Sequence, residues 1–248
     1  MIKNIDYSIG DIPDLTTEQM IEVDRAMIED YGIELIQMME NAGRNLAHLA
    51  RERFLAGDPR GKHVVVMAGR GGNGGGAMVC ARRLANWGAV VEVCLTREPG
   101  DFKGVPAQQL RILGRMQLPV SPPRSTAFFS DSSKIDLIVD GLIGYSLSGA
   151  PRGSAAEMIR WANGQRAPIL ALDAPSGLDT ATGQVFDPAI DAAATLTLAL
   201  PKQGLRSGLV QVGELYLADI SVPPALYQQS LGLEVGPLFA VSDLVRLQ

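Results

Sequence analysis

Residues 64–78 read VVVMAGRGGNGGGAM and decide the fold. The apolar, β-branched run at 64–68 predicts a buried strand, and a helical pattern follows at about 74–87. Most positions between them, at 69–76, are glycine. Glycine lets backbone N–H groups approach a phosphate closely, and the N-terminus of a helix adds a positive partial charge. The stretch therefore predicts a strand, a glycine loop and a helix, with function to be sought at the loop.

The same alternation of strand and helix continues along the chain. Further short apolar runs predict strands at 90–95, 137–139, 169–172, 196–200 and 215–217. Helical spacing of apolar residues predicts two helices within 15–56 and further helices at 105–116 and 154–163. We expect one α/β domain over 1–248 with a mainly parallel sheet covered on both faces. The Pro- and Ser-rich stretch 119–134 is predicted to be a loop, and a short helix is predicted near 242–247.

Composition excludes several classes of protein. With 248 residues and two cysteines, the chain can bury a large core and has no disulfide framework. A net charge of −5 and 5% aromatic residues argue against a partner that is a nucleic acid or an anionic membrane. The start of the chain has no signal-peptide pattern, and the longest apolar run, near 192–200, is too short to span a bilayer. We expect a cytoplasmic protein.

Two predicted strands end in aspartate, Asp140 and Asp173, each followed by a glycine-containing turn. Parallel strands present ligand-binding groups at their carboxyl ends, so both carboxylates are candidates for one pocket beside the glycine loop. Asp140 could instead cap the following turn. Asp173 follows an apolar strand, a setting that suits general acid–base work. Lys202 either faces the same pocket or lies solvated in a turn.

The glycine loop alone leaves three interpretations open. Gly69, Gly71 and Gly74 match the GxGxxG pattern of dinucleotide-binding folds. A dehydrogenase of that kind also needs an acid at the end of the second strand, where Glu92 lies too early and Glu98 too late. The glycines could also serve only for close strand–helix packing, or form a phosphate-binding loop of another family. We expect His48, His63 and Cys80 to be structural.

Taken together, the motifs resemble the YjeF N-terminal domain family, the NAD(P)H-hydrate epimerases, over about 15–220. Each motif is weak alone, but their order and spacing are specific. They are Thr17-Glu18-Gln19-Met20 with Val23-Asp24, Met39-Glu40-Asn41-Ala42-Gly43, Val139-Asp140-Gly141-Leu142-Ile143-Gly144 with Ser148-Gly149, Asp173-Ala174-Pro175-Ser176-Gly177-Leu178-Asp179, and Pro201-Lys202.

The resemblance implies an α/β fold, a three-layer α/β/α sandwich of Rossmann-like type. It implies an isomerase that interconverts the R and S forms of NADHX and NADPHX, the hydrates of reduced nicotinamide nucleotides, as a step of metabolite repair. A dehydratase on a separate polypeptide would act on the product, and a homodimer is common in the family.

The resemblance also implies a potassium ion with Asn73, Asp140 and Ser176 as side-chain ligands. Asp173 is the candidate catalytic residue, because one carboxylate that alternates between acid and base suffices for epimerisation. The substrate contacts implied are Gly72, Asn73, Gly74, Gly75, Gly76, Gly144, Tyr145, Ser146, Leu147, Ser148, Gly149, Ala150 and Asp173.

The glycine loop departs from the family pattern GxGNNGGDG. Gly72 and Gly76 stand where the family has Asn and Asp, so two side chains expected at the substrate are missing. Arg70, Arg97 or a water molecule could compensate. The alternative is a non-catalytic YjeF-type module for nucleotide binding or dimerisation, and a dehydrogenase is the weakest interpretation.

Overall fold

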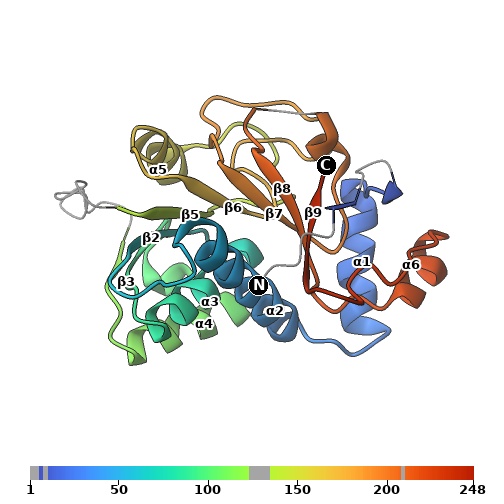
Figure 1. Cartoon of the computed structure of the whole chain (residues 1–248), viewed down its shortest axis with the longest axis horizontal. Helices are drawn as coiled ribbons and strands as arrows, with labels where there is room; N and C mark the ends of the chain where they lie inside the picture. The colour runs from blue at the N-terminus through green and yellow to red at the C-terminus, as the bar shows by residue number, and fades with distance from the viewer. Residues whose placement is uncertain (1–5, 8–10, 123–134, 208–209) are drawn as a thin grey trace.

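The computed structural model describes residues 6–7, 11–122, 135–207 and 210–248. Within these ranges, nine strands form one sheet in the order β1-β9-β8-β7-β6-β5-β2-β3-β4 (Figure 1). Every pair from β8 across to β4 is parallel, whereas β9 runs antiparallel to β8 and β1 runs parallel to β9. The strands are β1 (Asp6–Tyr7), β2 (His63–Ala68), β3 (Val90–Leu95), β4 (Val120–Ser121), β5 (Leu137–Gly141), β6 (Ile169–Leu172), β7 (Ala194–Leu198), β8 (Glu214–Ala218) and β9 (Leu244–Leu247).

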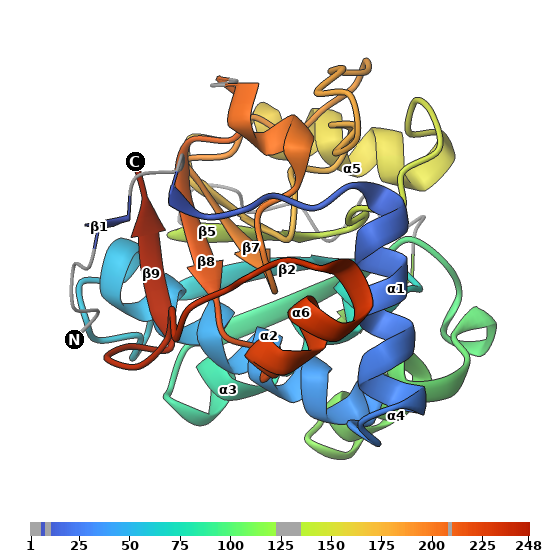
Figure 2. The same ribbon diagram turned by 90° about the vertical axis from the view of Figure 1, so that its right-hand side faces the viewer.

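Helices cover both faces of this sheet, so the predicted three-layer α/β/α sandwich is confirmed (Figures 1 and 2). On one face, α2 (Leu35–Leu49), α3 (Gly72–Asn86) and α4 (Gly104–Arg115) share a buried cluster with alternate residues of the strands. On the other face, α5 (Gly153–Asn163) packs over Ile138 and Ile169. The paired helices α1 (Thr17–Glu29) and α6 (Pro224–Leu231) share a third cluster with Leu215 and Leu217 of β8. None of the helices in the described ranges is both long and apolar enough to cross a bilayer.

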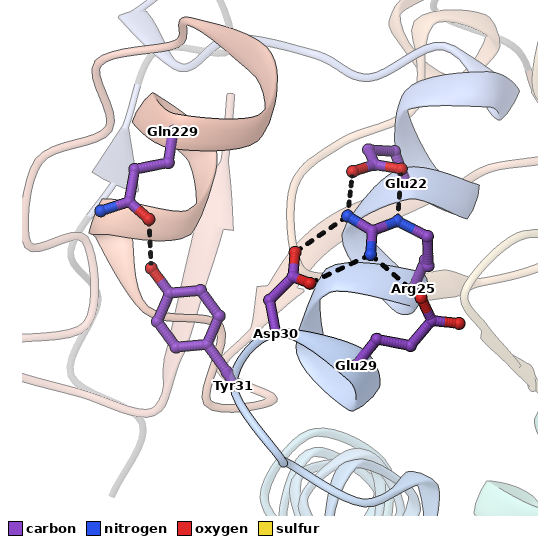
Figure 3. Close-up of polar contacts among 6 residues, drawn as sticks. All are labelled: Glu22, Arg25, Glu29, Asp30, Tyr31 and Gln229. Carbon is purple, nitrogen blue, oxygen red and sulfur yellow. Dashed lines mark hydrogen bonds and ion pairs between the residues drawn. The ribbon is translucent and has the colours of Figure 1, made fainter.

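The end of α1 is held by charged side chains (Figure 3). Arg25 donates hydrogen bonds to Glu22, Glu29 and Asp30, with N···O distances of 2.7–3.1 Å. Acidic side chains near a helix C-terminus are unfavourable, and the guanidinium offsets this charge. Just beyond the helix, Tyr31 Oη donates to Gln229 Oε1 at 3.1 Å and so links this end of α1 to α6.

The structure confirms the six strands predicted from 64–68 to 215–217 and the helices predicted between them. Their ends shift by no more than two residues. The predicted helix near 242–247 is wrong, because Leu244–Leu247 forms strand β9 against the edge of β8. A four-residue stretch with three apolar residues and Arg246 is compatible with either state, and here pairing with an open sheet edge decides. The helix α6 was not predicted. Of the predicted loop 119–134, Val120–Ser121 forms β4, and 123–134 lies outside the described residues.

The order of the strands places the ends of β2 and β5 side by side. The chain moves from β2 outward to β3 and β4, and then returns to add β5 on the other side of β2. Such a reversal opens a crevice at the carboxyl ends of the two strands, where open α/β sheets bind their ligands. The glycine loop follows β2, and Asp140 lies in β5 next to Met67 of β2. The topology therefore brings both predicted features to one place.

Candidate active site

A cavity of about 580 Å³ opens at this switch point. Its walls come from the glycine loop, the segments that follow β3, β5 and β6, and the helices α1 and α2. Methionine, leucine and glycine residues form much of the wall, and polar and charged side chains form the rest. This volume and this mixture are typical of small-molecule sites.

The glycine loop approaches the turn after β5 more closely than a side chain would allow. The N–H of Gly69 donates to the carbonyl of Gly141 at 3.0 Å. A Cβ on Gly69 would lie 2.0 Å from the Leu142 carbonyl oxygen, and one on Gly74 would lie 1.7 Å from the Gly69 carbonyl oxygen. Gly69 and Gly74 are therefore required by the backbone itself. By contrast, a Cβ on Gly72 would meet nothing closer than 3.9 Å.

Asn73 ties the first turn of α3 to the neighbouring strand. Its amide Nδ2 donates to the Leu172 carbonyl at 2.9 Å. Leu172 is the last residue of β6, directly before Asp173. This bond fixes the glycine loop relative to the carboxyl end of β6. It also sets Asn73 beside Gly144, where an added Cβ would lie 3.4 Å from Asn73 Oδ1.

Asp140 is fully buried and is held by Ser176. Its Oδ1 accepts from Ser176 Oγ at 2.7 Å and from the Leu142 N–H at 3.1 Å, and its Oδ2 accepts from the Ser176 N–H at 2.8 Å. Burial raises the pKa of Asp140 to about 6, although these hydrogen bonds oppose the shift. Within the described chain, no basic side chain lies within 4.0 Å of this carboxylate.

Asp173 forms a buried ion pair with Lys202. Lys202 Nζ lies 2.5 Å from Asp173 Oδ1 and also donates to the Leu198 carbonyl at 2.8 Å. Asp173 has a φ of +68°, a left-handed conformation that turns the chain sharply at the end of β6. Its Oδ2 accepts from the Tyr145 N–H at 3.0 Å. Both oxygens of the carboxylate therefore have a fixed donor.

Tyr145 connects Asp173 to a second carboxylate. Its phenol Oη donates to Asp24 Oδ2 on α1 at 2.6 Å. Burial raises the pKa of Asp24 against the opposing effects of the Tyr145 hydrogen bond and of Lys202. Asp24, Tyr145 and Asp173 all line the cavity. Tyr145 bonds to both carboxylates, and Lys202 holds Asp173 as well.

Comparison with known proteins places this arrangement in a family. The model of the YjeF-related protein N-terminus matches residues 35–204. The chain belongs to this family. An NAD(P)H-hydrate epimerase of Dehalogenimonas lykanthroporepellens is 42% identical over 95% of this chain and 93% of its own. One from Truepera radiovictrix is 40% identical over 88% of this chain and 92% of its own.

Other relatives in the YjeF-related family are longer. A bifunctional NAD(P)H-hydrate repair enzyme of Moorella thermoacetica is 36% identical over 86% of this chain, which spans 41% of that protein. The crystal structure of yeast ynu0, YNL200c, shares the fold, with a TM-score of 0.82 at 24% identity, over 95% of this chain and 100% of the yeast chain.

The YjeF-type site gathers about half of the predicted substrate residues on the cavity wall. Those on the wall are Gly72, Asn73, Gly76, Gly144, Tyr145, Ser146 and Asp173. Gly74 instead lies against the backbone of Gly69, and Gly75 lies against the side chain of Met39. Leu147, Ser148, Gly149 and Ala150 follow in the same turn, outside the set of cavity-lining residues. Substrate contact by any of these residues stays a prediction.

The structure also places Lys202, Cys80 and the two histidines. Lys202 is buried and faces Asp173, so the solvated-turn alternative is wrong. Cys80 is buried, as expected for a core residue. His48 packs against Trp87, and His63 pairs with Glu92 at 3.3 Å.

Asp24 was not predicted as a site residue. It follows Met20 by four positions and therefore shares the inner face of α1 with it. That spacing, together with the place of Asp24 in the Val23-Asp24 motif, is the signal in the sequence that could have found it. A polar residue at an inward-facing position of a helix is exceptional enough to mark a candidate site.

Proposed function

We propose that this protein is an NAD(P)H-hydrate epimerase, which interconverts the R and S forms of NADHX and NADPHX. The observation that carries the proposal is Asp173, which lines the switch-point cavity and is paired behind it with the buried Lys202, in a chain whose relatives over nearly their full length are named for this activity. Acid–base chemistry needs a carboxylate held in one position, and this one has a donor on each oxygen.

The substrate's own chemistry needs only one such group. C6 of the hydrate carries a hydroxyl beside the ring nitrogen and is a carbinolamine. A proton given to that hydroxyl lets it leave as water, and the nitrogen lone pair forms an iminium. Water then adds to the other face of the ring, and a base takes its proton. The proton that is spent in the first half is recovered in the second, so no redox partner is required.

Asp173 can perform both halves with Lys202 as its proton partner. Lys202 donates to Asp173 Oδ1, so the carboxylate can take from this ammonium the proton that it gives to the leaving hydroxyl. In the return step, the carboxylate takes a proton from the incoming water. The Tyr145 N–H holds Oδ2 and so keeps the carboxyl plane fixed. Assistance of this kind contributes roughly 10²–10⁴-fold in rate.

We also propose a potassium ion beside Asp140. The residues fit such an ion, because a fully buried carboxylate without a basic partner in the described chain has an uncompensated charge. Asn73, Asp140 and Ser176 supply oxygen donors, which a hard cation prefers. When bound, the ion would supply positive charge and fix the geometry of the loops. Cytoplasmic location, a homodimer and a dehydratase that consumes one epimer complete the proposal.

The test is the rate at which purified protein equilibrates the R and S forms of NADHX and NADPHX, resolved by chromatography. We expect equilibration faster than the spontaneous rate. If saturating protein leaves that rate unchanged, the epimerase proposal fails. Stabilisation of the protein by potassium without any turnover would then support the non-catalytic nucleotide-binding module instead.

A further inference from the structure

Three arginines stand at one end of the cavity without acidic partners. Arg70, Arg97 and Arg152 all line the cavity and all are exposed. No carboxylate lies within 4.0 Å of any of them in the part of the chain that the structure describes. Other arginines of the described chain, such as Arg25 and Arg53, have carboxylate partners, whereas Arg111 and Arg115 on α4 have none within 4.0 Å. What distinguishes Arg70, Arg97 and Arg152 is that they lack such a partner and also line the cavity. Unpaired guanidinium groups that surround a cavity are suited to an anionic ligand.

Backbone contacts hold the three arginine-bearing segments together. The N–H of Thr96 donates to the Ala68 carbonyl at 3.1 Å, which joins the segment of Arg97 to the glycine loop of Arg70. Ser154 Oγ donates to the Thr96 carbonyl at 2.6 Å, which joins the same segment to the start of α5, two residues after Arg152. The three positions are therefore fixed around Thr96, at the β2–β3 end of the cavity.

The opposite end of the cavity carries the acidic groups. Asp24 and Asp173 are the carboxylates among its described lining residues. Each already has a partner, Tyr145 for Asp24 and Lys202 for Asp173. The cavity is thus polarised, with free positive charge at the ends of β2 and β3 and the acid–base group at the end of β6. A nucleotide would place its phosphates at the first end and its nicotinamide at the second.

The segment after β3 decides which phosphate these arginines meet. In dinucleotide-binding α/β folds, the end of the second strand faces the adenosine ribose, where an acid binds the 2′-hydroxyl and an arginine accepts a 2′-phosphate. Here Arg97 stands two residues beyond β3. Neither of the two nearby acids, Glu92 and Glu98, is among the residues that line the cavity.

We propose that Arg97, supported by Arg70 and Arg152, binds the 2′-phosphate of the nucleotide, so that the phosphorylated hydrate NADPHX is the preferred substrate. This inference rests on the proposed function for its substrate, but its binding site can be tested without catalysis. The diphosphate, which both hydrates share, would lie at the glycine loop and the N-terminus of α3, so it does not account for Arg97.

The first experiment measures binding by calorimetry with two probes that lack nicotinamide, adenosine 2′,5′-bisphosphate and adenosine 5′-monophosphate. We expect the wild type to bind the bisphosphate more tightly, and Arg97→Gln to weaken that binding by about tenfold to hundredfold, the range for one charge-assisted hydrogen-bonded contact. Binding of the monophosphate should change less than threefold. Arg115→Gln is the matched control, because Arg115 is an exposed arginine on α4 outside the cavity.

The second experiment compares kcat/KM for NADPHX and NADHX. We expect the wild type to prefer NADPHX, and Arg97→Gln to reduce that preference through KM while kcat is kept. Equal affinity of the wild type for the two probes, or an equal loss on both hydrates, would overturn the inference. Failure of the epimerase proposal is distinguishable, because the wild type would then leave both hydrates at the spontaneous rate whatever the probes show.

Discussion

Lys202 Nζ lies 2.5 Å from Asp173 Oδ1, and the two side chains are only 1% and 5% exposed. Lys202 comes from the turn after β7 and Asp173 from the turn after β6, so the pair joins two neighbouring strand ends. Such a pair loses most of its hydration, and each charge depends on the other. The ion pair therefore contributes to the stability of the fold as well as to the candidate site.

The effects of removing the two members of this pair should therefore not be additive. We expect Lys202→Met to lower the free energy of unfolding by about 3–5 kcal/mol, because Asp173 is left as an uncompensated buried charge. The double variant Asp173→Asn with Lys202→Met should lose less than the sum of the two single variants. Urea unfolding of the four proteins measures this coupling. Additive losses would show that the two charges do not interact.

Gly43 should be required for the contact between α2 and α3. A Cβ at this position would lie 2.4 Å from the Gly76 carbonyl oxygen and 2.4 Å from Val79 Cβ. We expect Gly43→Ala to cost about 1–3 kcal/mol through overpacking. Gly114→Ala in α4 is the control, because a Cβ there meets nothing within 4 Å and alanine favours a helix. Thermal melting of both variants separates them, and a Gly43→Ala protein as stable as the wild type would refute the contact.

Gly72 and Gly76, where the resemblance predicts Asn and Asp, should respond differently to those two substitutions. A Cβ on Gly76 would lie 2.9 Å from Leu172 Cδ2, whereas the space at Gly72 is open. We expect Gly76→Asp to lose about 1–3 kcal/mol of stability, and Gly72→Asn to change it by less than about 0.5 kcal/mol. Denaturant midpoints of the two variants check this. Equal effects would mean that the crowding by Leu172 does not matter.

Acid should weaken the link between the segment after α2 and β8. Arg53 donates to both oxygens of Glu214, at 2.8 and 2.9 Å, and these hydrogen bonds lower the pKa of Glu214 to about 2. A carboxylate with a lowered pKa stabilises the fold above its unfolded pKa, about 4.5, and this contribution disappears as the pH falls toward 2.

Glu214→Gln should therefore cost about 1–2 kcal/mol at pH 7, discounted for the partial exposure of both partners, and nothing near pH 2. Unfolding curves of wild type and variant across this range measure the difference. Glu98→Gln is the control, since Glu98 is exposed and has no basic side chain within 4.0 Å among the described residues. A difference that stays constant with pH would contradict the assignment.

Much of this fold could be predicted because most of its strands are short apolar runs, and because the glycine loop marks the boundary between a strand and the next helix. The sheet edge could not, because Leu244–Leu247 becomes a strand only through pairing with β8. The acids Asp140 and Asp173 were predictable from their places at strand ends. Lys202 was ambiguous, since its partner is 29 residues away in the chain and only the topology brings the two together.

The central claim is that Asp173 moves the protons by which the C6 hydroxyl of the hydrate leaves and water returns. The most direct measurement follows epimer interconversion and ¹⁸O incorporation from labelled water into that hydroxyl in one reaction. We expect the wild type to accelerate epimer interconversion and ¹⁸O incorporation together. In Asp173→Asn, both rates should fall to about the spontaneous rate. An Asp173→Asn protein that epimerises as fast as the wild type, or wild-type epimerisation without accelerated label uptake, would contradict the account.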